Sequence, residues 1–179
     1  MDRLVLYVPF PMLHPAIDPE RLARIHPDIE VVTDPVFDIP HHERVTREQD
    51  PFGRAREIAT PLTDAQREAF ARADVVFTLD VPLDLPDVAP RLRFVQAIGS
   101  GVGQYVASRL PDGGIVLANG AGIGAPPIAE WVLGRTLQIL KLLPLHDANA
   151  REHRWDTALG SNLQGRTVAV VGLGAIGRE

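Results

Sequence analysis

A short apolar run followed by three regularly spaced glycines restricts the fold of this 179-residue chain more than any other feature. Residues 167–171 are typical of a buried parallel strand, and the residues from Gly172 to Gly177 fit the pattern G-x-G-x-x-G. In a strand-turn-helix unit the first glycine allows a tight turn, and the second lets a pyrophosphate approach the backbone. The third lets the helix pack closely against the strand. The pattern therefore predicts the start of a dinucleotide-binding βαβ unit. The residues expected to contact the cofactor are Gly172, Leu173, Gly174, Ala175, Ile176 and Gly177.

A complete unit of this kind needs a helix and a second strand as well, about 30 residues in all. Only two residues follow Gly177 in this chain. We therefore expect the chain to hold only the beginning of the nucleotide-binding domain, and whether Glu179 is the natural C-terminus stays open. Glycines in a strand-to-helix turn also serve packing alone, so the motif needs support from other parts of the sequence.

Composition excludes several classes of function. The net charge is −5, with 18 Lys and Arg against 23 Asp and Glu, so no basic face for nucleic acid is expected. The absence of cysteine excludes disulfides and thiolate chemistry. No stretch approaches the roughly 18 uninterrupted apolar residues of a membrane span, and the N-terminus lacks the apolar core of a secretory signal. These features favour a cytoplasmic protein.

Short apolar runs alternate with helix signals along the first 120 residues, which predicts a parallel sheet covered by helices. A proline after Asp18 predicts a helix over 19–25, and a capping box at Thr63 predicts another to about residue 72. A third, short helix is expected over 104–110. The expected strands are residues 4–8, 29–33, 74–79, 94–98 and 115–118.

Residues 34–61 show no strong period and contain several turn signals, so a long irregular connection is expected there. The adjacent histidines His41 and His42 belong to this stretch. Neighbouring side chains of this kind do not easily face one ion, so we expect a solvated segment and no metal site. Tyr7 and His14 follow the first strand closely, but ordinary structural roles explain them.

The longest helix signal covers residues 126–143, and its apolar residues are spread around most of the helix. A helix of this kind must be covered on most sides, by a core or by another subunit. We therefore expect a homodimer that uses this helix. The apolar residues are Ile128, Trp131, Val132, Leu133, Leu137, Ile139, Leu140, Leu142 and Leu143.

Residues 91–179 resemble the D-isomer-specific 2-hydroxyacid dehydrogenase family almost continuously, whereas residues 1–90 match it only in their alternation of strands and helices. The order and spacing of the matching segments are far more specific than the glycines alone. These segments are residues 91–96, 99–102, 114–119, 127–133, Trp155 and 163–168, which lead into the glycine turn.

The resemblance implies an α/β fold with two domains: a flavodoxin-like substrate domain, residues 1–98, and the start of a Rossmann NAD(P)-binding domain, residues 99–179, truncated at the glycine turn. It also implies hydride transfer between NAD or NADP and a small 2-keto or 2-hydroxy acid. Residues 127–131 look most similar to glyoxylate and hydroxypyruvate reductases. In such enzymes the catalytic arginine, acid and histidine follow the glycine turn. No catalytic residue is therefore assigned here, and residues 1–179 alone are expected to be inactive.

The resemblance assigns a substrate-binding role to the backbone N–H groups of Ser100, Gly101 and Val102, which follow a strand and would hold the substrate carboxylate. An ordinary tight turn is the alternative. The family commonly has an aspartate where this chain has Gly103, and the effect on substrate preference stays open.

Three further residues fall near the expected site. Asn119 and Pro127 lie where the family's loop approaches the nicotinamide, although Pro127 is equally explained as the first turn of the long helix. Glu130 is interpreted as structural, because an acid near a helix start suits the helix dipole.

Two other classes of function remain open. One is a truncated, non-catalytic relative that dimerises or binds a ligand. The other is a corepressor-like redox sensor built on the same scaffold. An arginine, an acid and a histidine in family order downstream would favour the enzyme. The sequence leaves open which acid is the substrate and whether the cofactor is NAD or NADP.

Overall fold

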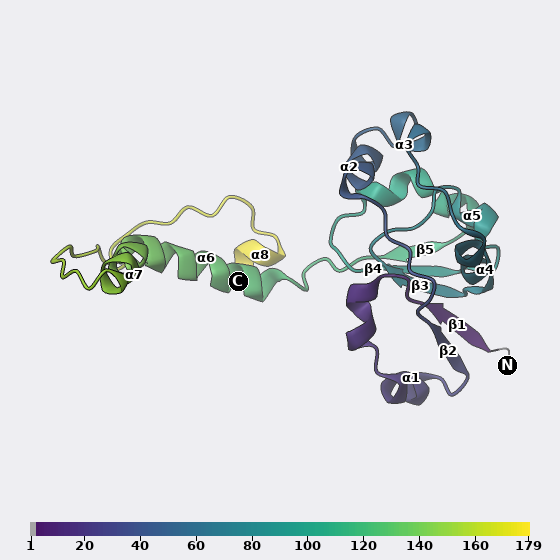
Figure 1. Ribbon diagram of the computed structural model, residues 1–179, viewed down its shortest axis with the longest axis horizontal. Helices are drawn as coiled ribbons and strands as arrows, with labels where there is room; N and C mark the ends of the chain where they lie inside the picture. Colours follow the sequence, from purple (N-terminus) through teal and green to yellow (C-terminus); the bar gives the residue numbers. More distant parts are fainter. Residues whose placement is uncertain (1–2) are drawn as a thin grey trace. The chain divides into compact units, whose positions relative to one another are not determined.

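Five short parallel strands form one sheet in the computed structural model, which describes residues 3–179 (Figure 1). Their order in the sheet is β2-β1-β3-β4-β5, the order of flavodoxin-like folds. Each strand lies within the range predicted from the sequence, and the predicted α/β class is confirmed. The strands are β1 (Leu4–Tyr7), β2 (Ile29–Val32), β3 (Val75–Thr78), β4 (Phe94–Ala97) and β5 (Val116–Ala118).

The chain divides into two compact units, one ending at Ala121 and the other comprising Gly122–Glu179. The first unit contains the whole sheet, because β5 pairs with β4 and so holds residues beyond 98 against the strands. The boundary expected between residues 98 and 99 concerns functional domains and stays a prediction. None of the helices in the described residues is both long and apolar enough to cross a membrane.

Two helices of the first unit begin at the caps read from the sequence. The carboxylate of Asp18 accepts hydrogen bonds from two backbone N–H groups of α1 (Pro19–Ile25). Thr63 and Gln66 form a reciprocal capping box at α4 (Asp64–Arg72). Because these side chains satisfy N–H groups that the helix leaves unpaired, they fix where each helix starts. The unit also contains the short helix α5 (Leu85–Val88) and the 3₁₀ helices η1 (Pro11–Ala16), η2 (Gly103–Ser108) and η3 (Leu110–Gly113).

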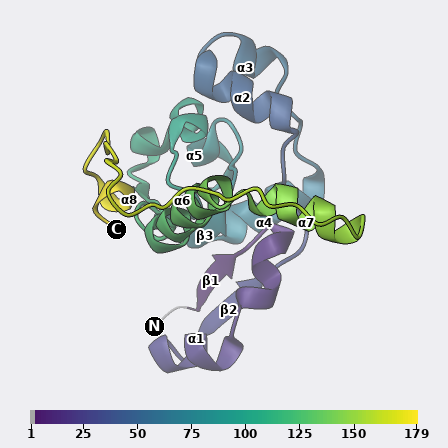
Figure 2. The same ribbon diagram turned by 90° about the vertical axis from the view of Figure 1, so that its left-hand side faces the viewer.

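The expectation of an irregular connection over residues 34–61 is wrong. This stretch contains α2 (His41–Gln49) and α3 (Arg54–Glu57), which Figures 1 and 2 place at the end of the unit away from α1. The side of α2 that is buried carries Glu43 and Arg47 instead of apolar residues. A helix that buries charged residues produces no apolar period, which explains why the sequence pattern missed it.

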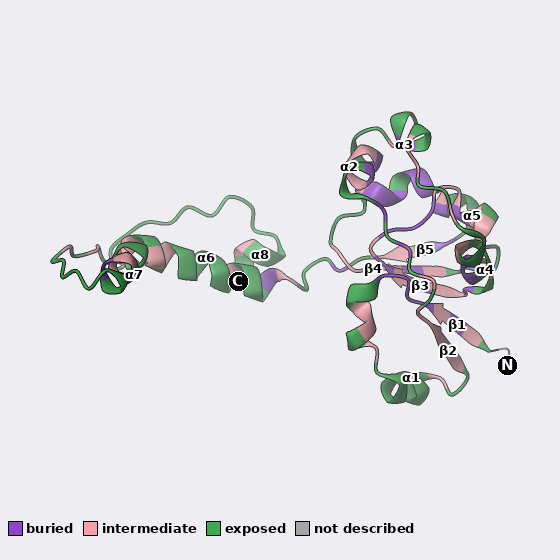
Figure 3. Cartoon of the chain, viewed as in Figure 1, coloured by how far each residue is buried: buried purple, intermediate pink, exposed green. Residues whose placement is uncertain are grey.

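The core of the first unit is apolar and includes a group of aromatic rings. The ring of Phe70 meets those of Tyr7 and Phe37 edge to face, at centroid distances of 5.0 and 5.5 Å. All three residues are buried. Most of the buried residues, coloured purple in Figure 3, belong to this unit. This core holds the sheet rigidly and so fixes the loops that leave its strands.

The only regular elements of the second unit, residues 122–179, are helices. They are α6 (Ala125–Leu140), α7 (Leu143–Arg151) and α8 (Ala175–Arg178). The predicted helix over 126–143 therefore ends earlier than expected, and Leu142, at a φ of 55°, separates α6 from α7.

The buried strand predicted over residues 167–171 is not formed. These residues have no regular structure, and Val168 and Val171 are 69% and 99% exposed. A parallel strand is stable only beside a hydrogen-bonded neighbour. The second unit contains no strand among its residues, 122–179, so this run has no partner there.

Candidate functional site

The loops after β3, β4 and β5 leave the sheet along the same edge, because Thr78 pairs with Ala97 and Gln96 pairs with Ala118 in register. In open α/β sheets, ligands bind beyond the carboxyl ends of the parallel strands. The first unit's candidate site is therefore the loop after β4, residues 99–102, with its two neighbours.

This β4 loop presents backbone donors that the protein itself does not use. Ser100, Gly101 and Val102 are all exposed. Within residues 3–179, none of their backbone N–H groups donates a hydrogen bond to another protein group. Adjacent free amides at the end of a strand are a recognised means of binding an anion. The carboxylate-binding role expected for these three residues stays a prediction.

The loop after β5 holds the first half of the β4 loop. The Asn119 side-chain amide donates to the carbonyl of Ser100 at 2.8 Å, and the Gly120 N–H donates to the carbonyl of Gly99 at 2.8 Å. A Cβ on Gly120 would lie 2.6 Å from the carbonyl oxygen of Ile98, so the close approach of the two loops requires glycine. Asn119 thus contacts the expected site through the backbone of Ser100.

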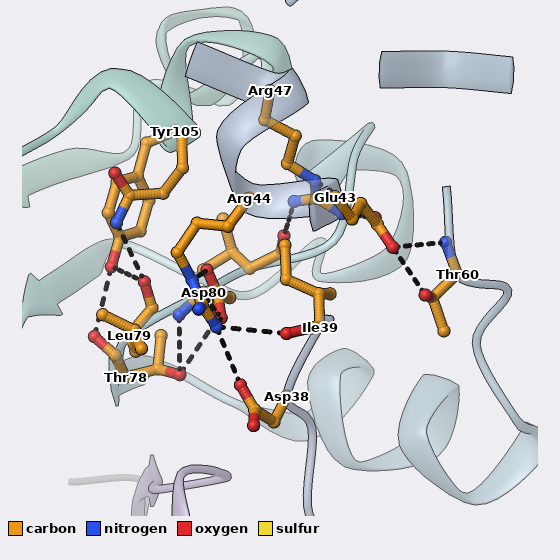
Figure 4. Close-up of polar contacts among 12 residues, drawn as sticks. Asp38, Ile39, Glu43, Arg44, Arg47, Thr60, Thr78, Leu79, Asp80 and Tyr105 are labelled. Carbon is orange, nitrogen blue, oxygen red and sulfur yellow. Dashed lines mark hydrogen bonds and ion pairs between the residues drawn. The ribbon is translucent and has the colours of Figure 1, made fainter. Parts of the chain in front are cut away.

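The 3₁₀ helix η2 attaches the second half of the β4 loop to the end of β3 (Figure 4). Tyr105 is 2% exposed, and its hydroxyl lies 3.1 Å from the carbonyl oxygen of Thr78 and 2.7 Å from that of Leu79. The side-chain amide of Gln104 donates to the Leu79 carbonyl at 3.3 Å. Burial raises the pKa of Tyr105, so its phenol stays protonated and remains a donor.

Gly103, which stands where the resembling family commonly has an aspartate, is closely approached by α2. A Cβ at this position would lie 3.0 Å from Cγ of Glu48. The side chain of Glu48 therefore fills the space that a larger residue at position 103 would enter, and an acid there would face a second carboxylate.

A group of two acids and one arginine joins α2 to the loop after β3. Arg44 donates through Nε to Asp80 at 2.9 Å and through Nη2 to Asp38 at 2.9 Å and to the Ile39 carbonyl (Figure 4). Asp80 is buried, whereas the Asp38 side chain is about half exposed. Partial loss of solvent around its carboxyl and the neighbouring carboxylate of Asp80 raise the pKa of Asp38, and the nearby Arg44 guanidinium partly opposes that shift.

A second pair on α2 is fully buried. Oε1 of Glu43 accepts from Arg47 at 2.8 and 3.2 Å, and Oε2 accepts from the backbone N–H and the hydroxyl of Thr60 at 3.0 and 2.6 Å. Arg47 also donates to the carbonyl of Val81 at 2.6 Å. These bonds fix α2 beside the loop after β3.

The glycine turn shows three different environments for its three glycines. Gly172 has a φ of +97°, which favours glycine. A Cβ at Gly174 would meet nothing within 4 Å, so the backbone there is open to a ligand. A Cβ at Gly177 would lie 2.0 Å from the carbonyl oxygen of Gly172. The close contact of Gly177 is therefore made within the turn itself, and the cofactor-binding role of residues Gly172 to Gly177 stays a prediction.

Other residues from the sequence analysis have ordinary positions. Pro127 lies in the first turn of α6, and Glu130 is exposed on the same helix. His41 and His42 are exposed at the start of α2, and the described residues contain no cluster suited to a metal ion. Sequence reasoning missed Arg44, because its buried partner Asp80 lies 36 positions further along the chain.

The chain matches no protein-family model. Its curated relatives include the D-3-phosphoglycerate dehydrogenase of Methanocaldococcus jannaschii, 28% identical over 155 residues, which are 83% of this chain and 28% of the relative. A glyoxylate/hydroxypyruvate reductase of Arabidopsis thaliana is 28% identical over 138 residues, 68% of this chain and 43% of the relative.

A solved structure shows the same similarity in three dimensions. It is the NADPH-dependent glyoxylate/hydroxypyruvate reductase of Sinorhizobium meliloti in complex with citrate, with a TM-score of 0.64 and 26% identity. The match covers 99% of this chain and 49% of the reductase. The relatives of this chain are D-isomer-specific 2-hydroxyacid dehydrogenases. The resemblance expected from the sequence is thus confirmed, and the chain spans about half of the solved reductase and less than half of these curated relatives.

Proposed function

We propose that this protein acts as an NAD(P)-dependent D-2-hydroxyacid dehydrogenase on a small 2-keto or 2-hydroxy acid. The observation that carries the proposal is the β4 loop: three exposed residues with free backbone N–H groups at the carboxyl end of a central strand. Similarity to a glyoxylate/hydroxypyruvate reductase supports it independently. The loop would bind the substrate carboxylate and so place C2 of the acid at a fixed distance from the sheet edge.

The cofactor would be held by residues Gly172 to Gly177, whose open and close-packed positions fit a bound pyrophosphate. When bound, NAD(P) supplies or accepts the hydride that converts keto acid and hydroxy acid. The chain's own part is to bind and orient, with the β4 loop on the acid and the glycine turn on the cofactor.

The proposal is tested by measuring consumption of NADPH and NADH by the full-length protein with glyoxylate and with hydroxypyruvate. Turnover of either acid is expected, and glycolaldehyde, which lacks the carboxylate, should be a poor substrate. Residues 1–179 alone should be inactive, since in the resembling family the arginine, acid and histidine follow the glycine turn. A full-length protein that oxidises neither cofactor with any 2-keto acid would contradict the proposal.

A variant of the turn separates cofactor binding from folding. Gly174→Val places a side chain where the backbone is open, so it should leave the fold intact and weaken NAD(P)H binding. A titration of the full-length variant measures this directly. Cofactor affinity equal to that of the wild type would mean that the turn serves packing alone.

We also propose a homodimer through the helix expected over 126–143. In α6, Trp131 is 66% exposed, Leu133 is 53% exposed and Ile139 is 66% exposed. Exposed apolar residues on one helix form the kind of patch that a partner surface covers. This observation also favours the second candidate function, a non-catalytic dimerisation or ligand-binding module. A cytoplasmic location is part of the proposal, and cell fractionation tests it.

A further inference from the structure

The β4 loop contains two glycines, Gly99 and Gly101, and a side chain added at either position would contact almost no other atoms. A Cβ at Gly101 would meet nothing within 4 Å, and one at Gly99 would only reach the Gly101 nitrogen at 4.0 Å. Glycine leaves the backbone many conformations. Packing therefore does not hold this loop in shape, and its hydrogen bonds to neighbouring loops must do so.

Those hydrogen bonds lie on both sides of the free amides. Asn119 and Gly120 hold the carbonyls of Ser100 and Gly99 at the β5 side. At the β3 side, Tyr105 donates its backbone N–H to the carbonyl of Val102 at 3.1 Å. The loop is thus fastened at each end and left unpaired in the middle.

Tyr105 connects the loop to the rest of the sheet edge. Its backbone N–H donates to the carbonyl of Val102. Its hydroxyl lies within hydrogen-bond distance of the carbonyls of Thr78 and Leu79 at the end of β3 (Figure 4). A phenylalanine would fill the same buried space, so the hydroxyl is needed only for these bonds. We propose that Tyr105 is a positioning residue that fixes the β4 loop so that its amides meet the substrate carboxylate.

This inference rests on the proposed function, because it assumes that the β4 loop binds the carboxylate. Its consequence is a pre-organised anion site: the amides stand ready, and binding does not have to order a glycine-rich loop. Without the Tyr105 hydroxyl, part of the ordering of the β4 loop has to occur when the acid binds. The affinity for the acid is then weaker, while the structure of the bound complex is unchanged.

Tyr105→Phe is the test, and the structure indicates that this variant folds. The carbonyl of Thr78 keeps the Ile98 N–H as a donor at 3.1 Å, and the carbonyl of Leu79 keeps the side-chain amide of Gln104. Neither acceptor is left without a partner. Tyr7→Phe is the matched control, because Tyr7 is equally buried and donates its hydroxyl to a carbonyl, that of Pro35.

The full-length protein is measured in two ways: by the KM and kcat for glyoxylate, and by the Kd of malonate, a dicarboxylate probe that needs no turnover. For Tyr105→Phe we expect KM and the malonate Kd to rise about three- to tenfold, the effect of one neutral hydrogen bond. The kcat and the Kd of NADPH should stay within about twofold of the wild type by the same reasoning. Tyr7→Phe should leave all four values unchanged.

Two results would overturn the inference. A Tyr105→Phe variant with unchanged KM and malonate Kd shows that the hydroxyl does not position the loop. A fall in kcat with unchanged KM shows a loss of folded protein instead. If the wild type itself neither reduces glyoxylate nor binds malonate, the proposed function fails, and the inference fails with it.

Discussion

Replacing Glu43 by alanine should destabilise the first unit strongly, although α2 lies outside the apolar core. Glu43 and Arg47 are both 1% exposed or less, and the carboxylate accepts four hydrogen bonds. The variant leaves a buried guanidinium without its counter-ion, and breaking a buried pair in this way costs about 3–5 kcal/mol. Domains of this size have a free energy of unfolding of roughly 5–15 kcal/mol, so this is a large fraction.

Urea unfolding of the 179-residue chain measures the effect. For a dependence of about 1–3 kcal/mol per molar urea, the midpoint should fall by about 2 M. Near-ultraviolet circular dichroism reports the first unit, because Tyr7 and Tyr105 are buried there while Trp131 and Trp155 lie in the second unit and are mostly exposed.

Arg56→Ala serves as the control for this experiment. Arg56 pairs with Asp84 at the surface, where both side chains are more than a third exposed. Solvent screens such a pair, so this variant should keep the wild-type midpoint. If Glu43→Ala also kept the wild-type midpoint, the buried pair would not hold α2, and the explanation given for this helix would be wrong.

Three further outcomes are expected. Gly177→Ala should disrupt the glycine turn, because its Cβ would lie 2.0 Å from the Gly172 carbonyl oxygen, and the loss of NAD(P)H binding by the full-length variant measures this. The raised pKa of Asp38 means that the folded protein takes up this proton more readily than the unfolded chain. Ionised Asp38 therefore disfavours the folded state, and this penalty should shrink as the pH falls through the raised folded pKa toward about 4, the ordinary value; Asp38→Asn should remove this pH dependence of Tm. Replacing Leu137 and Leu140 by glutamate should shift the full-length protein toward monomer or insolubility in sedimentation, and a wild-type monomer at micromolar concentration would contradict the dimer.

The sheet was predictable because its signals are local. Each strand is a short apolar run, and the caps at Asp18 and Thr63 form bonds within three residues of themselves. Such features depend on neighbouring residues in the sequence and need no knowledge of the fold. The position of the β4 loop followed from the same reasoning, since it comes directly after a predicted strand.

The rest depended on contacts between distant residues. Arg44 meets Asp80 across 36 positions and Tyr105 meets Leu79 across 26, and no short pattern encodes either contact. The prediction of a strand over 167–171 was wrong although the local signal was clear. The composition is that of a strand, but a strand needs a hydrogen-bonded neighbour, and residues 122–179 contain none.

The proposed function depends above all on binding of the substrate carboxylate by the β4 loop. A crystal structure of the full-length protein with malonate and NADP is the decisive experiment. We expect a carboxylate of malonate within about 3 Å of backbone nitrogens among Ser100, Gly101 and Val102, the ordinary hydrogen-bond distance. Malonate bound elsewhere, with these three amides turned away or paired within the protein, would contradict it.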